Sequence, residues 1–252
     1  MEAAPSLYWG GGMIITIHNA KGGVGKTTTT INLGVNLATA GQRVLIIDGD
    51  RQHNATFGLG QDPQPGVYNW IVEGRFEPVS VRPTLDLLPS ARKPSWWEQS
   101  TLDVVTQRFR ELPAYDWIIV DTNPSQSDWV DSVLKISDAI LIPVDFGLYA
   151  VAGVSELIED LDSSRIIGLV PVRYDLRNNV SIELLEQLKH MGGSLVAPPI
   201  RISVDVERAA ARGQSMAEYN PRSKMAEDYV TLTEWMVTTL AERIEQQPQQ
   251  PH

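Results

Sequence analysis

The sequence predicts an α/β fold: a mostly parallel, twisted sheet with helices on both of its faces. Apolar runs rich in β-forming residues alternate along the chain with stretches of helical periodicity, an alternation typical of a parallel sheet. The apolar runs are continuous instead of alternating with polar residues, which indicates strands buried on both faces. A glycine-rich segment between the first strand and the first helix suggests a phosphate-binding turn.

The first predicted strand, 13–17, leads into the glycine-rich segment, and the first predicted helix, 28–40, leads out of it. The later predicted strands are the apolar runs at 43–47, 85–88, 117–120, 139–144 and 166–172. The later predicted helices are the periodic stretches at 98–112, 127–136, 151–161, 181–191 and 223–244. In sheets of this kind ligands bind beyond the carboxyl ends of the strands, so residues that follow strands are the first candidates for a site.

Composition favours one compact domain over residues 13–245, because 252 residues can bury a substantial core. Residues 1–12 are expected to form a flexible leader, and residues 246–252, rich in glutamine and proline, a disordered tail. The absence of cysteine excludes a disulfide framework, a thiolate metal site and an iron–sulfur cluster. No run is long enough to span a membrane and no signal-peptide pattern is present, so we expect a cytoplasmic protein.

The segment from Lys21 to Thr28 carries the strongest functional signal. Its glycines allow backbone N–H groups to curl around phosphate oxygens, and the following helix adds positive partial charge. Lys26 can reach the β- and γ-phosphates, and the hydroxyl of Thr27 can bind Mg²⁺. The predicted nucleotide-binding residues are therefore Lys21, Gly22, Gly23, Val24, Gly25, Lys26, Thr27 and Thr28.

Carboxylates follow two other predicted strands. Asp48 and Asp50 come directly after strand 43–47, and such a pair can meet a metal-bound phosphate or hold an attacking water. A plain acidic cap on the strand end is the alternative reading. Asp121 follows strand 117–120, the position at which nucleotide-binding sheets place an aspartate that holds Mg²⁺.

Three segments resemble the ParA/MinD family of P-loop ATPases. Residues 20–27, with a second lysine at Lys21, resemble the family's deviant Walker A motif. Residues 48–56 resemble its first switch region, D-x-D-P-Q-x-x-A-T, with Arg51 in place of the usual proline, and residues 121–125 resemble its D-x-P-P segment, with Asn123 replacing one proline. The resemblance extends over residues 13 to 240 and is nearest to small ParA proteins that lack an N-terminal DNA-binding extension.

The resemblance implies an ATPase that binds ATP with Mg²⁺ and forms a homodimer around two nucleotides. Lys21, Lys26 and Asp50 would be catalytic, with Lys21 reaching the partner's phosphates and Asp50 orienting the attacking water. Thr27, Asp121 and Asp48 would form or support the Mg²⁺ shell. Adenine contacts would come from Arg173, after strand 166–172, and from Pro199.

The process that such an ATP-dependent dimer would control is left open between three interpretations. In the first, the ATP-bound dimer binds nonspecific double-stranded DNA, associates with the nucleoid, and drives segregation or positioning of a plasmid, chromosome region or other cargo with a ParB-like activator. In the second, it binds a membrane surface as MinD-type proteins do. In the third, it is a metabolic P-loop phosphotransferase, for which no second substrate motif is evident. Adenine is preferred over guanine because no Asn/Thr-Lys-x-Asp motif occurs.

Charge separates the first two readings. The last predicted helix is crowded with glutamate and aspartate, whereas a membrane-surface helix needs lysine and arginine, so no membrane partner is expected. The formal net charge of −10 opposes DNA binding unless positive charge is concentrated locally. Residues 201–224 hold five basic against three acidic side chains, and the predicted DNA-binding residues are Arg201, Arg208, Arg212, Arg222 and Lys224.

Overall fold

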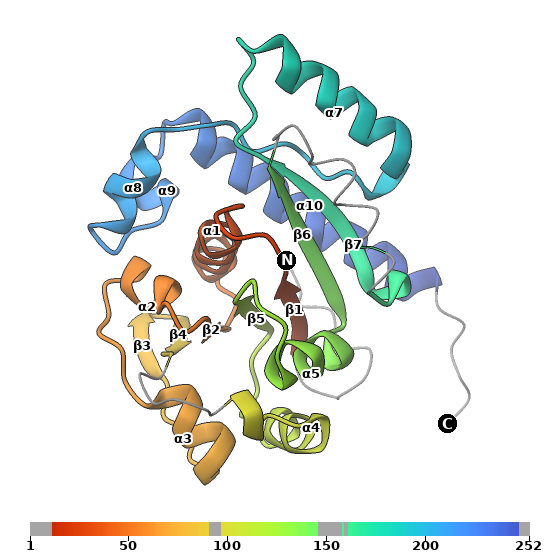
Figure 1. Ribbon diagram of the computed structural model, residues 1–252. Helices are drawn as coiled ribbons and strands as arrows, with labels where there is room; N and C mark the ends of the chain where they lie inside the picture. Colours follow the sequence, from red (N-terminus) through yellow and green to blue (C-terminus); the bar gives the residue numbers. More distant parts are fainter. Residues whose placement is uncertain (1–11, 91–96, 146–157, 159–160, 247–252) are drawn as a thin grey trace.

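The computed structural model describes residues 12–90, 97–145, 158 and 161–246. Its centre is a seven-stranded sheet in the order β3-β4-β2-β5-β1-β6-β7 (Figure 1). All neighbouring strands are parallel except the edge pair β3 and β4, which is antiparallel. The strands are β1 (Met13–Ile17), β2 (Val44–Gly49), β3 (Val79–Arg82), β4 (Leu85–Leu88), β5 (Trp117–Thr122), β6 (Ala139–Asp145) and β7 (Ile166–Val172). The predicted fold class is therefore confirmed.

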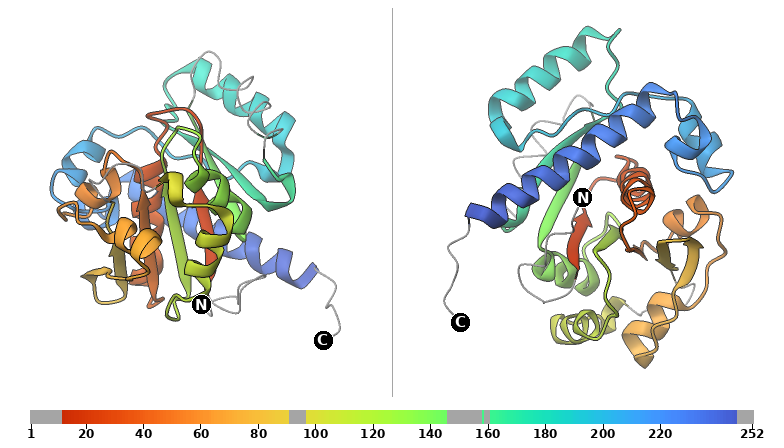
Figure 2. Two further views of the ribbon diagram at one scale, coloured as in Figure 1. Left: turned by 60° about the horizontal axis from the view of Figure 1, so that its bottom comes forward. Right: turned by 180° about the vertical axis from the view of Figure 1, so that it is seen from behind.

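Helices cover both faces of this sheet. Figure 1 shows α1 and α10 on one side of the strands and α3, α4 and α5 on the other, and in Figure 2 α10 crosses the first of these faces. The α-helices are α1 (Lys26–Thr39), α2 (Asn54–Gly58), α3 (Gly66–Glu73), α4 (Leu102–Arg110), α5 (Asp128–Ile136), α7 (Asn179–Gly192), α8 (Asp205–Ala210), α9 (Met216–Tyr219) and α10 (Lys224–Gln246). Short 3₁₀ turns are η1 (Trp97–Gln99), η2 (Ser163–Arg165) and η3 (Gly193–Leu195).

Each face of the sheet has its own apolar core. On one side Leu33 and Leu37 of α1 and Leu232 and Met236 of α10 pack against the strands, all of them almost fully buried. On the other side, the core is formed by side chains from α3, α4 and α5 together with the opposite faces of β2 and β5, including Trp70, Phe109, Trp129 and Val133. Because the apolar stripe of α10 is buried, this helix is part of the core. None of the described helices is long and apolar enough to cross a membrane.

Strand register brings the predicted carboxylates together. In the β2–β5 ladder Asp48 pairs with Asp121, and in the β1–β5 ladder Ile17 also pairs with Asp121. The carboxyl ends of β1, β2 and β5 therefore meet at one edge, directly below the glycine-rich loop that starts after β1. Residues far apart in the sequence thus share one location in the fold.

Several elements differ from the sequence prediction. The predicted helix 98–112 is the turn η1 followed by the shorter α4, and the strand β3 and the helices α2, α3, α8 and α9 were not predicted. The predicted helix 151–161 lies outside the described residues except for Ile158 and Leu161. The predicted leader and tail also lie outside them, except that Gly12 is described and Gln246 ends α10.

Candidate nucleotide-binding site

The glycine-rich loop between β1 and α1 has the backbone shape of an anion cradle. Gly23 and Gly25 have φ values of 73° and 78°, in the left-handed region that side chains avoid, and Gly25 caps the start of α1. Such turns can aim several backbone N–H groups at one point, where the helix N-terminus adds partial positive charge. Lys21, Gly22 and Gly23 are exposed on the rim of the loop.

The ammonium of Lys26 lies under the loop. It donates to the carbonyl oxygens of Asn19, at 2.9 Å, and of Lys21, at 3.0 Å. Burial lowers the pKa of Lys26, although the carboxylates of Asp121 and Asp50 act in the opposite direction. The lysine is thus held at the centre of the loop, where an entering phosphate would meet it.

Asn19 is a site residue that the sequence analysis missed. Its side-chain amide donates to the carbonyl of Pro143 in β6 at 2.7 Å, and its side-chain oxygen accepts from the backbone N–H of Lys21 at 2.8 Å. It therefore fixes the base of the loop against the neighbouring strand. A single asparagine after a strand gave no signal, because its partner in β6 is distant in sequence.

The predicted metal-binding pair is joined by a hydrogen bond. The hydroxyl of Thr27 donates to Oδ2 of Asp121 at 2.7 Å, and that of Thr30 contacts Oδ1 at 3.4 Å. Asp121 is fully buried, and burial together with the nearby Asp48 raises its pKa well above the usual range. A buried carboxylate of this kind would be stabilised by a cation, so the pair fits Mg²⁺.

The hydroxyl of Thr27 and the carboxylate of Asp121 also match the coordination preference of Mg²⁺. Mg²⁺ usually takes one or two carboxylates and completes its shell with water and substrate phosphates. Within the part of the chain that the structure describes, no group of three or more His, Cys, Asp or Glu side chains could hold a metal ion. The Thr27–Asp121 pair supplies two oxygen ligands, so an ion held there would need water or phosphate oxygens to complete its shell.

Asp48 and Asp50 occupy different environments. Both oxygens of Asp48 are engaged: Oδ2 accepts from the N–H and hydroxyl of Thr56, at 2.8 and 2.6 Å, and Oδ1 from the N–H of Asp50 at 3.1 Å. Burial raises the pKa of Asp48 to about 6. Asp48 therefore supports the loop that carries Asp50, and its part in a Mg²⁺ shell stays a prediction.

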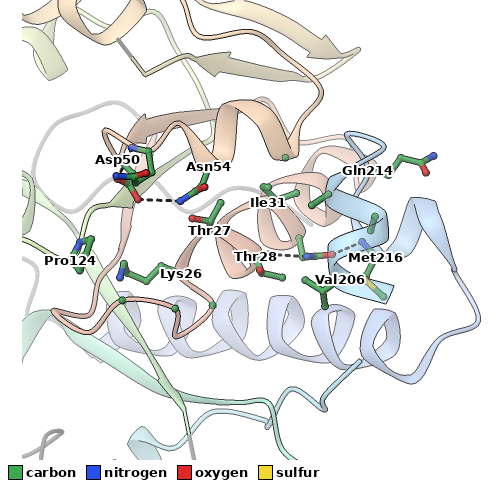
Figure 3. Close-up of a pocket in the computed structure, with 18 residues that line it drawn as sticks. Lys26, Thr27, Thr28, Ile31, Asp50, Asn54, Pro124, Val206, Gln214 and Met216 are labelled. Atoms are coloured by element: carbon green, nitrogen blue, oxygen red, sulfur yellow. Dashed lines mark hydrogen bonds between the residues drawn. The ribbon is translucent and has the colours of Figure 1, made fainter. Parts of the chain in front are cut away.

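Asp50 itself faces a cavity of about 470 Å³ that begins at the glycine-rich loop. Figure 3 shows Asp50, Pro124 and Lys26 at one end of this cavity and Val206, Gln214 and Met216 at the other. From the loop and the start of α1, the cavity is lined by Gly22, Gly23, Gly25, Lys26, Thr27 and Thr28. Six of the eight predicted residues of the phosphate loop thus line one cavity with Asp50, whereas Lys21 and Val24 are not among its lining residues.

The two predicted adenine contacts are separated. Arg173 lines a second cavity together with Gly23, Gly25 and Thr28 of the loop. Pro199 lines a third one with Tyr174, Leu176 and Arg201, away from the loop. Arg173 also has a φ of 60°, and its guanidinium lies 3.6 Å from Asp145. The placement favours Arg173 over Pro199 as a neighbour of a nucleotide base, and both assignments stay predictions.

Most of the predicted DNA-binding side chains are engaged within the protein. Arg201 binds both carboxylate oxygens of Asp228, which comes from α10. Arg208 pairs with Asp205, Lys224 pairs with Glu227, and the guanidinium of Arg212 lies 5.1 Å from the ring centre of Tyr219. Aspartate and glutamate from α10 thus offset part of the positive charge counted along the sequence. Arg222 is exposed.

His18 connects the loop to the end of β5. The hydroxyl of Thr122 donates to the carbonyl of Ile17 at 2.8 Å, so its oxygen is left to accept from Nδ1 of His18 at 3.0 Å. This pattern assigns the hydrogen of the neutral ring to Nδ1. Burial, with a smaller contribution from Lys26, lowers the pKa of His18 to about 4. A neutral imidazole therefore lies beside the candidate phosphate site.

Four features together define a P-loop nucleotide-binding protein: a mostly parallel sheet, a glycine-rich loop after the inner strand β1, a buried lysine under that loop and a hydrogen-bonded Thr–Asp pair below it. Comparison with known proteins narrows the class. A family model described as an AAA domain matches residues 12–166. The chain is 34% identical to the sporulation initiation inhibitor protein Soj of Bacillus subtilis, covering 88% of this chain and 96% of that protein. It is 31% identical to the chromosome-partitioning ATPase Soj of Thermus thermophilus, covering 90% and 96%.

Solved structures share the fold. The chain superposes on apo McdA of Cyanothece with a TM-score of 0.78 at 23% identity, covering 89% of this chain and 99% of that one. It superposes on the septum site-determining protein MinD of Pyrococcus horikoshii, solved with Mg-ADP, with a TM-score of 0.74 at 21% identity, covering 89% and 95%. The chain belongs to the ParA/MinD family of P-loop ATPases.

Proposed function

We propose that this protein is an ATP-dependent dimerising switch of the ParA type. In the ATP-bound state it binds nonspecific duplex DNA, and it drives segregation or positioning of a plasmid, chromosome region or other cargo. It acts in the cytoplasm, associates with the nucleoid when ATP is bound, and is turned over by a ParB-like activator. The names of the relatives at 31–34% identity, Soj proteins of two bacteria, support this reading.

The observation that carries the proposal is the contrast between the two lysines of the loop. Lys26 is buried and bonded to loop carbonyls, whereas Lys21 is exposed on the rim. Among the described residues the Lys21 ammonium makes no ion pair or hydrogen bond. A cation displayed in this way suits a role across an interface, where it would meet the phosphates of a second subunit.

The proposed reaction uses the chain's own groups in distinct roles. Lys26 and the loop N–H groups would bind the phosphates, while Thr27 and Asp121 would hold Mg²⁺. Bound Mg²⁺ would neutralise charge on the β- and γ-phosphate oxygens. Asp50 orients the attacking water, and Lys21 of the partner subunit stabilises negative charge that develops on the γ-phosphoryl group. Hydrolysis then removes the group that joins the two subunits, so the dimer separates.

The membrane and phosphotransferase readings receive less support. The apolar residues of α10 are buried in the core instead of being available to a lipid surface. The sequence offers no motif for a second small-molecule substrate. The ParA-type switch therefore remains the preferred function.

The test is binding to nonspecific duplex DNA with Mg-ATP, with Mg-ADP and without nucleotide, each across a salt series. We expect binding with Mg-ATP only, and a steep loss of affinity with salt. Lys26→Ala, which loses the phosphate contact, is the negative control. ATPase activity without DNA binding in any state would contradict the DNA part of the proposal and leave the ATPase part standing.

Two variants test the dimer. Asp50→Ala should accumulate the ATP-bound dimer, because binding is kept and hydrolysis is lost, and size-exclusion chromatography with ATP measures this directly. Lys21→Ala should bind ATP but fail to dimerise or turn over. A monomeric Asp50→Ala protein, or normal turnover by Lys21→Ala, would contradict the two-subunit mechanism.

A further inference from the structure

Arg51 lies in the loop that carries Asp50, where it makes a contact specific to its side chain. Its guanidinium carbon is 4.4 Å from the centre of the Trp97 ring. This distance is well within the range of a cation–π interaction, in which tryptophan is the most favourable ring and arginine the more frequent cation. Arg51 sits between Asp50 and Gln52, both of which line the candidate nucleotide cavity. The contact therefore begins one residue from the proposed water-orienting carboxylate.

Trp97 packs against the face of the sheet that α3, α4 and α5 cover. It begins η1 and packs against the apolar core formed with α3, α4 and α5. The carbonyl of Trp97 accepts from the N–H of Ser100 at 3.3 Å, and the carbonyl of Ser100 accepts from the hydroxyl of Ser132 at 2.9 Å. Ser132 lies in α5, the helix that follows residues 121–125. The turn that carries the ring is thus hydrogen-bonded to α5, the helix that follows residues 121–125.

The Asp50 loop is also tied down on its other side, by bonds that do not involve Arg51. The hydroxyl of Ser90 donates to the carbonyl of Asp50 at 2.6 Å, and the N–H of Ser90 donates to the hydroxyl of Thr56 at 3.2 Å. These bonds join the loop to the end of β4. The Arg51–Trp97 contact adds an attachment to a different layer, so that together they hold the loop from two directions.

We propose that Arg51 is a positioning residue for ATP hydrolysis: by stacking on Trp97 it holds the Asp50 loop in place and couples that loop to α5. This inference rests on the proposed ATPase function. In the resembling family motif a proline occupies this position and restricts the loop through its fixed φ. Arginine replaces that covalent restriction with a contact to a ring on another element, which links the Asp50 loop to η1 and, through the Ser132–Ser100 hydrogen bond, to α5.

The first experiment measures steady-state ATP hydrolysis by Arg51→Gln and Trp97→Leu. Each should lower kcat about two- to fivefold, the range expected for losing an exposed to half-buried cation–π contact. KM for ATP should stay unchanged, because the phosphate loop is untouched. The double variant should be no slower than either single variant, since both remove one contact. Arg51→Lys, which keeps a cation, should recover part of the rate.

Two controls keep the result interpretable. Arg177→Gln removes another exposed arginine, far from Trp97 along the chain and paired with Asp175, and should leave kcat unchanged. If Trp97→Leu does not fold, Trp97→Phe replaces it in the kcat measurement. Phenylalanine keeps an aromatic face but is a weaker cation–π partner than tryptophan, so the loss in kcat should be smaller. Tryptophan emission of the nucleotide-free protein should change on Arg51→Gln, but not when Arg51→Gln is made in the Trp97→Phe background.

The outcomes separate this inference from the proposed function. If the wild-type protein does not hydrolyse ATP, the proposed function fails, and the emission measurement still tests the contact. If the wild-type protein turns over ATP and Arg51→Gln has normal or raised kcat, the positioning role is overturned. Additive losses in the double variant would also overturn it, because the two residues would then act separately.

Discussion

The hydroxyl of Thr27 donates to Oδ2 of Asp121 across 2.7 Å, joining the first turn of α1 to the carboxyl end of β5. Both groups are suitable oxygen ligands for Mg²⁺, and we expect a nucleotide phosphate to complete the shell of an ion bound there. The bond shows that the two predicted ligands already stand at contact distance. Removing either oxygen should therefore weaken Mg²⁺ binding.

Thr27→Ala should raise the Mg²⁺ concentration needed for half-maximal ATPase activity by at least about tenfold, because one oxygen ligand is lost. Thr27→Ser keeps the hydroxyl and should remain close to wild type. Thr231→Ala, which removes an exposed hydroxyl on α10, is the control. Equal Mg²⁺ dependence in Thr27→Ala and wild type would exclude Thr27 from the metal shell.

His18 should make stability depend on pH in a defined direction. Its pKa is lowered from 6.5 to about 4 in the folded protein, so between pH 4 and 6.5 the unfolded chain binds a proton that the folded protein does not. The contribution of His18 to stability is therefore present above pH 6.5 and is lost as the pH falls towards 4. Once the pH has fallen below 4, the lost contribution to the free energy of unfolding amounts to about 3 kcal/mol.

The measurement compares urea unfolding of wild type and His18→Gln at several pH values. The comparison is needed because Asp48, whose pKa is raised to about 6 by burial, contributes a slope of the opposite sign in an overlapping window. Relative to wild type, His18→Gln should gain stability as the pH falls from 6.5 to 4. A constant difference across that range would contradict a neutral buried His18.

Gly22 tests the dimer without disturbing the monomer. A Cβ built at Gly22 meets nothing within 4 Å, so Gly22→Ala should change the free energy of unfolding by less than about 0.5 kcal/mol. If two backbones approach closely at this exposed loop, the same methyl group should weaken ATP-dependent dimerisation, measured by analytical ultracentrifugation. Gly49→Ala is the contrasting variant, because its Cβ would collide with Trp129 and lie 2.7 Å from the carbonyl of Asp121.

Arg201 and Arg222 should behave differently although both belong to the predicted basic patch. Arg201→Ala breaks a bidentate, partly buried pair with Asp228 and should cost about 1 kcal/mol of stability. Arg222→Ala should leave stability unchanged, weaken DNA binding uniformly across sequences, and reduce the salt slope by about one. The reverse pattern would move the DNA contact to Arg201.

Much of the central sheet was predictable because its strands are continuous apolar runs. The runs at 13–17, 85–88 and 166–172 match β1, β4 and β7 residue for residue. The edge strand β3 was not, because its residues are partly exposed and its four-residue segment mixes apolar with polar side chains. The short helices α8 and α9 were missed because segments of six and four residues are too short to show a helical period in the sequence.

Some residues of the candidate site could be predicted from the sequence, and others depend on partners that are distant along the chain. The phosphate loop and Asp121 follow from local sequence, and the register of β2, β1 and β5 brings their surroundings together. The role of Asn19 depends on Pro143, 124 residues away, and the pairing of Arg201 depends on Asp228, 27 residues away. A count of charges within residues 201–224 could not include an aspartate that α10 delivers from outside that range.

The hydrogen bonds of Lys26 have a consequence for how the loop would respond to a phosphate. Its ammonium binds the backbone carbonyls of Asn19 and Lys21, so the loop supplies its own provisional ligands for the lysine. A phosphate that attracts this ammonium must take it from those carbonyls, and one of them belongs to the residue that displays the exposed cation. We therefore expect phosphate binding to release the carbonyl of Lys21, so that filling the site would change the backbone contacts of the residue that carries the exposed cation.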